Sequence, residues 1–119
     1  MNVKEFYENI GGNYSKALET MMMDDFIKRM LTKFYQSTTY NDLYAASKTK
    51  DVEAIFHLTH TLKGVGGNLA LTPLQEKATI VCELTRNQST VDLAKLEVEL
   101  NELLEIYQKI NVNLELLLK

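Results

Sequence analysis

The sequence is poor in the residues that interrupt helices. Its 119 residues include one proline and five glycines, the residue types that most strongly break helices and mark turns. This composition points to long helices and an all-α fold. A chain of this length builds one hydrophobic core. We therefore expect a single helical domain over residues 1–119, with short N-terminal helices in residues 1–22 and a four-helix up-and-down bundle in residues 23–119.

Other features are equally scarce. The single cysteine, Cys82, has no partner for an internal disulfide or a CxxC pair, which agrees with a reducing compartment. No apolar run approaches the roughly 18 residues of a membrane span, and the charged start has no signal-peptide core. The net charge is -3 and there is no basic run that would neutralise nucleic-acid phosphates. We expect a cytoplasmic protein with neither a membrane nor a nucleic-acid partner.

Apolar spacing and capping residues divide the chain into consecutive helices. The expected helices lie in Val3–Ile10, Tyr14–Met22, Asp24–Phe34, Tyr40–Ser47, Asp51–Ala70 and Thr72–Arg86. A turn is expected at Asn87–Thr90, before a last helix that carries the residues from Leu93 to Leu117. Thr72 is expected to be an N-cap, with Gln75 as its capping-box partner. Ser89 is expected to cap the last helix, with Asp92 as its partner. Tyr44 is expected to face inward.

The last helix carries an apolar seam with alternating steps of three and four residues. Its members are Leu93, Leu96, Leu100, Leu103, Tyr107, Ile110, Leu114 and Leu117. Such a seam requires neighbouring helices packed at a shallow angle, as in a four-helix bundle. A dimer seam is the alternative. Because Leu104 and Leu116 widen the apolar face beyond that of a two-stranded coil, we favour packing within one chain and expect a monomer.

The most informative stretch is Asp51–Ala70, which is centred on His60. On a helical wheel of about 100° per residue, one apolar stripe gathers Ile55, Leu58, Leu62, Val65 and Leu69. The opposite side, within roughly 60° of the histidine, holds Glu53, Phe56, His57, Lys63, Gly64 and Gly67. Because the stripe must be buried, His60 is expected to face solvent or a partner.

Glycines on that outer face are unusual, because a glycine within a helix costs about 1 kcal/mol relative to alanine. Gly64 lies one turn after His60 and Gly67 two turns after, so together they would flatten the helix beside the imidazole and let another backbone approach. The alternative is that Gly64, Gly66 and Gly67 end or kink the helix. The apolar stripe keeps its helical period through the glycines, which favours a continuous helix.

The run from His60 to Leu69, HTLKGVGGNL, resembles the signature of histidine-containing phosphotransfer domains. That signature is a histidine, then a lysine and a glycine one turn on, small residues, an asparagine and an apolar residue. The opening EFYENIGGNY extends the resemblance to small stand-alone members over nearly the whole chain. Thr59, where alanine is usual, and Ala70, where glycine is frequent, depart from the pattern. Cys82 stands where some members carry a glutamine that hydrogen-bonds the imidazole.

The resemblance implies a phosphorelay intermediate that accepts a phosphoryl group on His60 from a receiver-domain aspartate and passes it to another. An imidazole in water is largely uncharged at neutral pH, so one ring nitrogen is a free nucleophile. Lys63 supplies a point charge for the phosphoryl oxygens, which stabilises the transfer and still allows release. The two residues are therefore our catalytic candidates.

The same face supplies candidates for receiver docking. Phe56 is an aromatic residue on a side that should be wet, which indicates a contact surface. His57, Gly64 and Gly67 share that side, and Arg86 on the next helix is a docking candidate by resemblance. A solvated histidine, a stray surface aromatic and a solvated arginine are the simpler interpretations of these side chains.

The chain lacks the groups that would let it catalyse alone. It has no clustered carboxylates for Mg²⁺ and no phosphate-binding GxxxxGKS loop. We therefore expect no cofactor and no metal in this chain, and a phosphotransfer protein that is not an enzyme by itself. The resemblance implies that the partner brings the Mg²⁺ and the aspartyl phosphate. The expected partners are response-regulator receiver domains and a hybrid histidine kinase.

Three other interpretations stay open at this point. Glu53, His57 and His60 are spaced to share one helix face and could ligate a metal, although Lys63 opposes a cation there. The chain could be a helical adaptor whose apolar groove binds a partner helix. A histidine-kinase dimerisation hairpin also exposes a histidine, but an acidic residue usually follows it, and Thr61 follows here.

Overall fold

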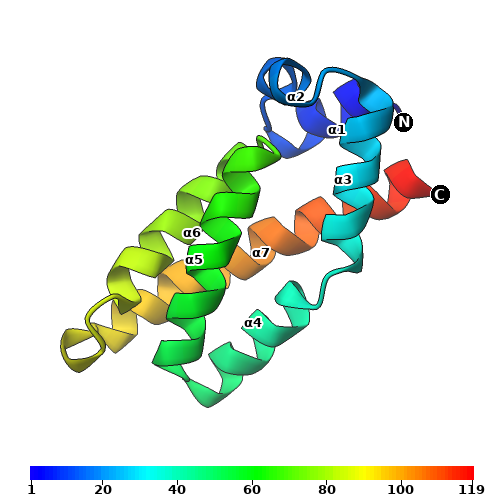
Figure 1. The fold of residues 1–119 in the computed structure, drawn as a ribbon. Helices are drawn as coiled ribbons and strands as arrows, with labels where there is room; N and C mark the ends of the chain where they lie inside the picture. The colour runs from blue at the N-terminus through cyan, green and yellow to red at the C-terminus, as the bar shows by residue number, and fades with distance from the viewer.

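The computed structural model describes all of residues 1–119 and contains helices without strands. The helices are α1 (Val3–Ile10), α2 (Tyr14–Met21), α3 (Asp24–Gln36), α4 (Thr39–Thr49), α5 (Val52–Asn68), α6 (Thr72–Thr85), the short 3-10 helix η1 (Gln88–Thr90) and α7 (Leu93–Leu118). Figure 1 shows them in chain order. The predicted all-α fold is confirmed, and α5 runs unbroken through its glycines, as the apolar period indicated.

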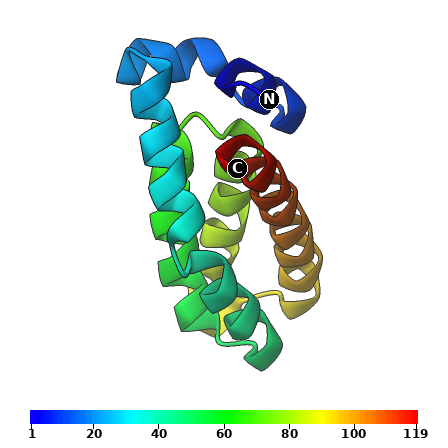
Figure 2. The same cartoon turned by 90° about the vertical axis from the view of Figure 1, so that its right-hand side faces the viewer.

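The helices form an up-and-down bundle with two short helices across one end. In Figure 2, α3 and α4 follow one another down one side, and α5, α6 and α7 then alternate in direction. One of the four columns is therefore made of two helices, which part at Ser37 and Thr38. α1 and α2 lie at the end where α3 begins and α7 finishes. The molecule measures 44 × 25 × 19 Å, so α7, with its 26 residues, runs most of its length.

Side-chain caps fix where several helices begin. Asn2 accepts a hydrogen bond from the backbone N–H of Glu5, whose carboxylate accepts one from the N–H of Asn2, which makes a full capping box. Asn13 caps α2 and Asp51 caps α5 in the simpler one-bond form.

Two predicted caps are wrong. α6 begins with Thr72 and Pro73 as its first residues, the cap position belongs to Leu71, and no side chain caps the helix. Leu71 is completely buried and its carbonyl accepts the N–H of Gln75, so core packing sets this start. At the last helix the cap is Asp92, not Ser89, because Ser89 is taken up in η1.

The core follows the predicted seam of α7 with one exception. Seven of its eight members are buried: Leu96, Leu100, Leu103, Tyr107, Ile110, Leu114 and Leu117. Leu93 is 55% exposed because it is the first residue of α7. Tyr44 was also predicted to face inward and is 47% exposed. It stacks on Tyr40, which instead meets the buried ring of Tyr107 edge-on at 5.2 Å.

The N-terminal helices are tied to the turn between α5 and α6. The hydroxyl of Tyr7 donates to the carbonyl of Leu69 at 2.6 Å, and the N–H of Asn13 donates to the carbonyl of Ala70 at 3.0 Å. Ala70 has a positive φ of 55°, a left-handed conformation in which glycine is the usual residue. These bonds hold one end of α5 in place.

No helix combines the length and the apolar character that crossing a bilayer requires.

Candidate functional site

α5 separates an inner face from an outer face, as its period predicted. Ile55 and Leu62 are buried and Leu58 is half-buried, whereas His57 and His60 are exposed. Thr59, where the resemblance expects alanine, is fully buried. Its hydroxyl donates to the carbonyl of Ile55 at 2.8 Å, so the extra polar group is satisfied within the helix.

The imidazole of His60 stands free of polar contacts. The side-chain hydrogen bonds and ion pair of α5 come from Asp51, Thr59 and the pair of His57 with Glu53, and none reaches His60. Its one aromatic neighbour is Phe56, whose ring centroid lies 6.1 Å away at a tilt of 43°. The ring is therefore accessible to an electrophile that arrives from solvent.

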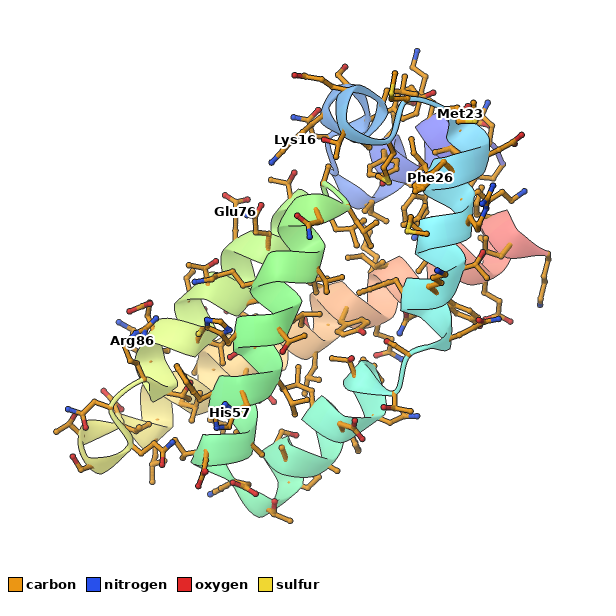
Figure 3. The ribbon with its side chains drawn as sticks, viewed as in Figure 1. Lys16, Met23, Phe26, His57, Glu76 and Arg86 are labelled. Atoms are coloured by element: carbon orange, nitrogen blue, oxygen red, sulfur yellow. The ribbon has the colours of Figure 1, made fainter.

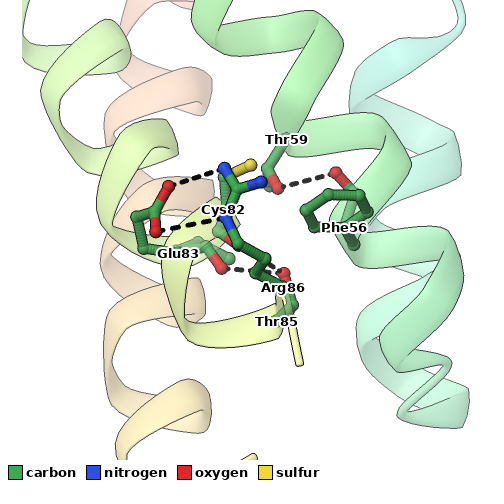
Figure 4. A network of polar contacts seen from close by, with 7 residues as sticks. Phe56, Thr59, Cys82, Glu83, Thr85 and Arg86 are labelled. Atoms are coloured by element: carbon green, nitrogen blue, oxygen red, sulfur yellow. Dashed lines mark hydrogen bonds and ion pairs between the residues drawn. The ribbon is translucent and has the colours of Figure 1, made fainter. Parts of the chain in front are cut away.

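Phe56 lies beneath an ion pair from α6. The guanidinium of Arg86 sits 5.6 Å from the centre of the Phe56 ring and donates to both carboxylate oxygens of Glu83, at 2.7 and 3.3 Å. Figure 4 shows Arg86 between Phe56 and Glu83. Arg86 thus points to the α5 face, but its charge already has a partner.

Charged side chains of α5 and α6 influence one another beside His60. Hydrogen bonding and charge from Arg86 hold the pKa of Glu83 below its ordinary value, and the charge of Lys63 acts in the same direction. Lys63 is half-buried on α5, and its effect on the pKa of Glu83 indicates that its charge reaches α6. The predicted catalytic pair, His60 and Lys63, shares one open helix face.

The three glycines of α5 have different surroundings. A Cβ on Gly64 would meet nothing within 4 Å, whereas one on Gly66 would stand 3.2 Å from the backbone nitrogen of Gln75. A Cβ on Gly67 would stand 2.8 Å from the side-chain nitrogen of the same residue. Gly64 therefore leaves bare backbone open to solvent, and Gly66 and Gly67 let α6 approach α5.

The structure assigns Gln75 a position that the sequence did not predict. Gln75 was expected in a capping box with Thr72, but its backbone packs on Gly66 and its side chain covers Gly67. The signal for such a contact is a pair of glycines opposite a long side chain on the next helix, and it becomes visible only when the two helices are placed together.

Cys82 is fully buried on the inner side of α6. It behaves as a small core residue. The hydrogen bonds around it involve the hydroxyl of Thr85, which donates to the carbonyls of Val81 and Cys82. The position that holds a supporting glutamine in some phosphotransfer domains therefore gives His60 no hydrogen bond here.

The geometry does not favour the metal-site alternative. His57 and Glu53 approach to 3.9 Å and both side chains are largely exposed. No three His, Cys, Asp or Glu side chains are grouped so that they could hold a metal ion. The contact between His57 and Glu53 does not include His60.

The N-terminal helices border this face without covering it. Lys16 and Thr20 of α2 line a hollow together with Lys63, Gly64 and Gly67, and His60 and Gly64 both remain exposed. An open histidine on the middle of a bundle helix, with a lysine one turn on and bare backbone beside it, is thus present in the folded chain.

Comparison with known proteins identifies the family. The model of the Hpt domain matches residues 21–110 of the 119-residue chain, from the end of α2 to most of α7. The chain belongs to the Hpt domain family. Hpt domains are helical carriers of phosphoryl groups in phosphorelays rather than classical catalysts, and they work with the response-regulator and kinase components of two-component systems. The comparisons with curated proteins and with solved structures gave no match.

Proposed function

We propose that this Hpt domain accepts a phosphoryl group on His60 from the phosphorylated aspartate of a receiver domain and passes it to the aspartate of another. The observation that supports the proposal most directly is the exposure of His60 on the same face as Lys63 and the bare backbone of Gly64. The family match supplies the class of chemistry, and the face supplies the residues for it.

The transfer is a displacement at phosphorus. The lone pair of an unprotonated ring nitrogen of His60 forms the new N–P bond. The bond between phosphorus and the aspartate oxygen breaks, and the carboxylate of the receiver leaves with that electron pair. The return step to a second receiver reverses these roles. No proton has to be removed from the attacking nitrogen, so no general base is required of this chain.

Lys63 stabilises the charge that spreads over the phosphoryl oxygens during the displacement. Phosphoryl transfer depends mainly on positioning and on such electrostatic stabilisation. Lys63 makes no ion pair of its own, so its ammonium is available. A lysine holds phosphate as a point charge rather than as a two-pronged clamp, which suits a group that must leave again.

Docking would use the rest of the open face. The proposed contacts are Phe56 and His57 below the imidazole, Gly64 and Gly67 above it, and Arg86 from α6. The receiver would hold the Mg²⁺ and the aspartyl phosphate, and a hybrid histidine kinase would stand upstream. In this arrangement the carrier presents a nucleophile and a charge, and the partner completes the catalytic site.

The two histidines of the face provide the test. Purified chain would be incubated with receiver domains phosphorylated with labelled phosphate, and the protein-bound label would be tested for the acid lability and alkali stability of phosphohistidine. We expect the label on the parent chain, the label again but at a lower rate on His57→Ala because His57 is a proposed docking contact, and no label on His60→Ala. Label that persists on His60→Ala would contradict the proposal, and function without any label would favour the adaptor alternative.

A further inference from the structure

A polar hollow lies at one end of the open face, where α2 meets α5 and α6. Its volume is about 440 Å³, and no apolar residue lines it. Lys16 and Thr20 border it from α2, Lys63 and Gly67 from α5, and Gln75 from α6. Figure 3 shows Lys16 beyond the ends of α5 and α6. The hollow begins at Lys63, one turn after His60. A partner that reaches His60 would therefore also lie over the hollow.

The groups around the hollow can donate hydrogen bonds, and none of them is a carboxylate. Lys16 and Lys63 carry its positive charge, and neither is engaged in an ion pair. The side-chain amide of Gln75 adds a nitrogen that lies against Gly67. Two free ammonium groups and an amide donor match an anionic ligand with oxygen acceptors.

Lys16 occupies a position that local helix stability disfavours. It is the third residue of α2, whose cap is Asn13, and positive charge in the first turn opposes the helix dipole. In α1 the equivalent position after the cap Asn2 holds Glu5, which closes the capping box. The two N-terminal helices therefore have the same type of cap and opposite charges at this position, so the lysine in α2 needs another explanation.

Lys16 lies outside residues 21–110, the part that matches the Hpt domain model. Its place is nevertheless fixed relative to the family motif, because the N–H of Asn13 donates to the carbonyl of Ala70 at the turn between α5 and α6. A residue outside the matched region thus borders the same hollow as Lys63, Gly64 and Gly67.

We propose that the hollow receives an acidic side chain, aspartate or glutamate, that the receiver domain carries beside its phosphorylated aspartate, with Lys16 and Lys63 as paired cationic contacts. This inference rests on the proposed function, because it assumes that a receiver docks on the α5 face. Lys16 then helps to determine which receiver is accepted. The competing explanation is that Lys16 serves the negative end of the α5 dipole, which would make it a stability residue.

The test measures binding without transfer. In a His60→Gln chain, which holds no nucleophile, the affinity for the source organism's receiver domains would be titrated at low and at high salt. We expect Lys16→Glu to weaken binding about tenfold at low salt, with a smaller effect near 0.3 M salt, where screening shortens the range of charges to about 6 Å. Lys109→Glu makes the same change of net charge on α7, on the other side of the bundle, and should alter affinity less than about twofold.

The Lys16→Glu variant provides its own control for a folding defect. A glutamate at position 16 would follow Asn13 as Glu5 follows Asn2, so it can close a capping box and should leave the melting temperature equal or higher. A lower melting temperature with unchanged binding would overturn the inference in favour of the dipole role. Unchanged binding at an unchanged melting temperature would overturn it as well.

The two proposals fail in different ways. If receivers label His60 and bind Lys16→Glu as tightly as the parent chain, the inference about the hollow is wrong and the proposed function stands. If no receiver binds the parent chain or labels it, both are overturned. Weaker binding of Lys16→Glu that salt largely removes, with Lys109→Glu unaffected, is the result that supports an acidic contact.

Discussion

The side-chain nitrogen of Gln75 lies 2.8 Å from the place that a Cβ on Gly67 would occupy. The gap that this glycine leaves in α5 is therefore filled by α6 of the same chain. At Gly64, one turn nearer to His60, the corresponding space is open to solvent. Gly64 and Gly67 were both predicted to flatten the face for a partner. Packing within the chain explains why position 67 is a glycine, but it does not explain the glycine at position 64.

The different surroundings of Gly64 and Gly66 predict opposite effects of alanine substitutions on stability. Gly64→Ala should leave the protein as stable or raise the free energy of unfolding by up to about 1 kcal/mol, because alanine favours the helix. If docking needs bare backbone there, transfer from a receiver should slow. Gly66→Ala places its Cβ 3.2 Å from the backbone of Gln75, which cannot move aside as a flexible side chain can. It should destabilise by about 1 kcal/mol.

Denaturant unfolding and the rate of phosphoryl transfer would be measured on both variants. A Gly64→Ala chain that is less stable than the parent would show that the position is packed. A chain that is stable and transfers at the parent rate would remove Gly64 from the docking surface. Gly66→Ala is the comparison variant, because there a slower phosphoryl transfer can result from a loss of stability.

Lys63→Ala should slow transfer to His60 by about tenfold or more, because removing a charge aimed at phosphoryl oxygens costs transition-state stabilisation. Stability should change by less than about 0.5 kcal/mol, since Lys63 makes no ion pair. Single-turnover kinetics with a phosphorylated receiver would measure the rate. Lys63→Arg keeps the charge and should recover most of it. Equal rates for all three chains would show that Lys63 takes no part.

Tyr7→Phe tests the clamp between the N-terminal helices and α5. The change removes the hydrogen bond to Leu69 and should lower the free energy of unfolding by about 1 kcal/mol near pH 7. Burial raises the pKa of Tyr7 above its ordinary value near 10. The folded chain thus keeps a proton that the unfolded chain loses, so the parent loses stability as the pH rises above about 10.

The variant should therefore lose stability less steeply than the parent above that pH. The dependence should not vanish, because burial also raises the pKa of Tyr107. Urea unfolding at a series of pH values between neutral and strongly alkaline would measure both slopes. Parallel slopes for parent and variant would mean that Tyr7 does not contribute to the alkaline loss.

Cys82 should react slowly with thiol reagents in the folded chain, because its side chain is fully buried. In denaturant the same thiol should react at the rate of a free cysteine. The measurement is the time course of a chromogenic disulfide reagent, with and without urea. Cys82→Ala should destabilise by about 1 kcal/mol through the lost sulfur contacts. Rapid reaction of the native protein would indicate that α5 and α6 separate readily.

The sequence predicted helix faces better than helix starts. Periodicity identified the buried and exposed sides of α5 and nearly all of the α7 seam, because burial repeats with each turn of a helix. It failed for Leu93, the first residue of α7, which is 55% exposed. It also failed at Thr72, because the burial of Leu71 rather than a polar cap sets where α6 begins.

The candidate site divides in the same way. His60, Lys63 and Gly64 lie on one helix, so their common face could be read from spacing alone. Gln75 and Lys16 reach the same surface from other helices, and their positions depend on how α2, α5 and α6 pack. A local signal for Lys16 does exist, namely a cation in the first turn of a helix, but it shows only that the residue is unusual and not where it lies.

The hydrogen bond from Asn13 to Ala70 joins two turns through backbone atoms. Because neither end of this bond is a side chain, main-chain geometry sets where the backbone of Lys16 on α2 lies relative to that of His60 on α5. A docking receiver would therefore contact Lys16 and His60 together only if its acidic side chain lay at a matching distance from its phosphorylated aspartate.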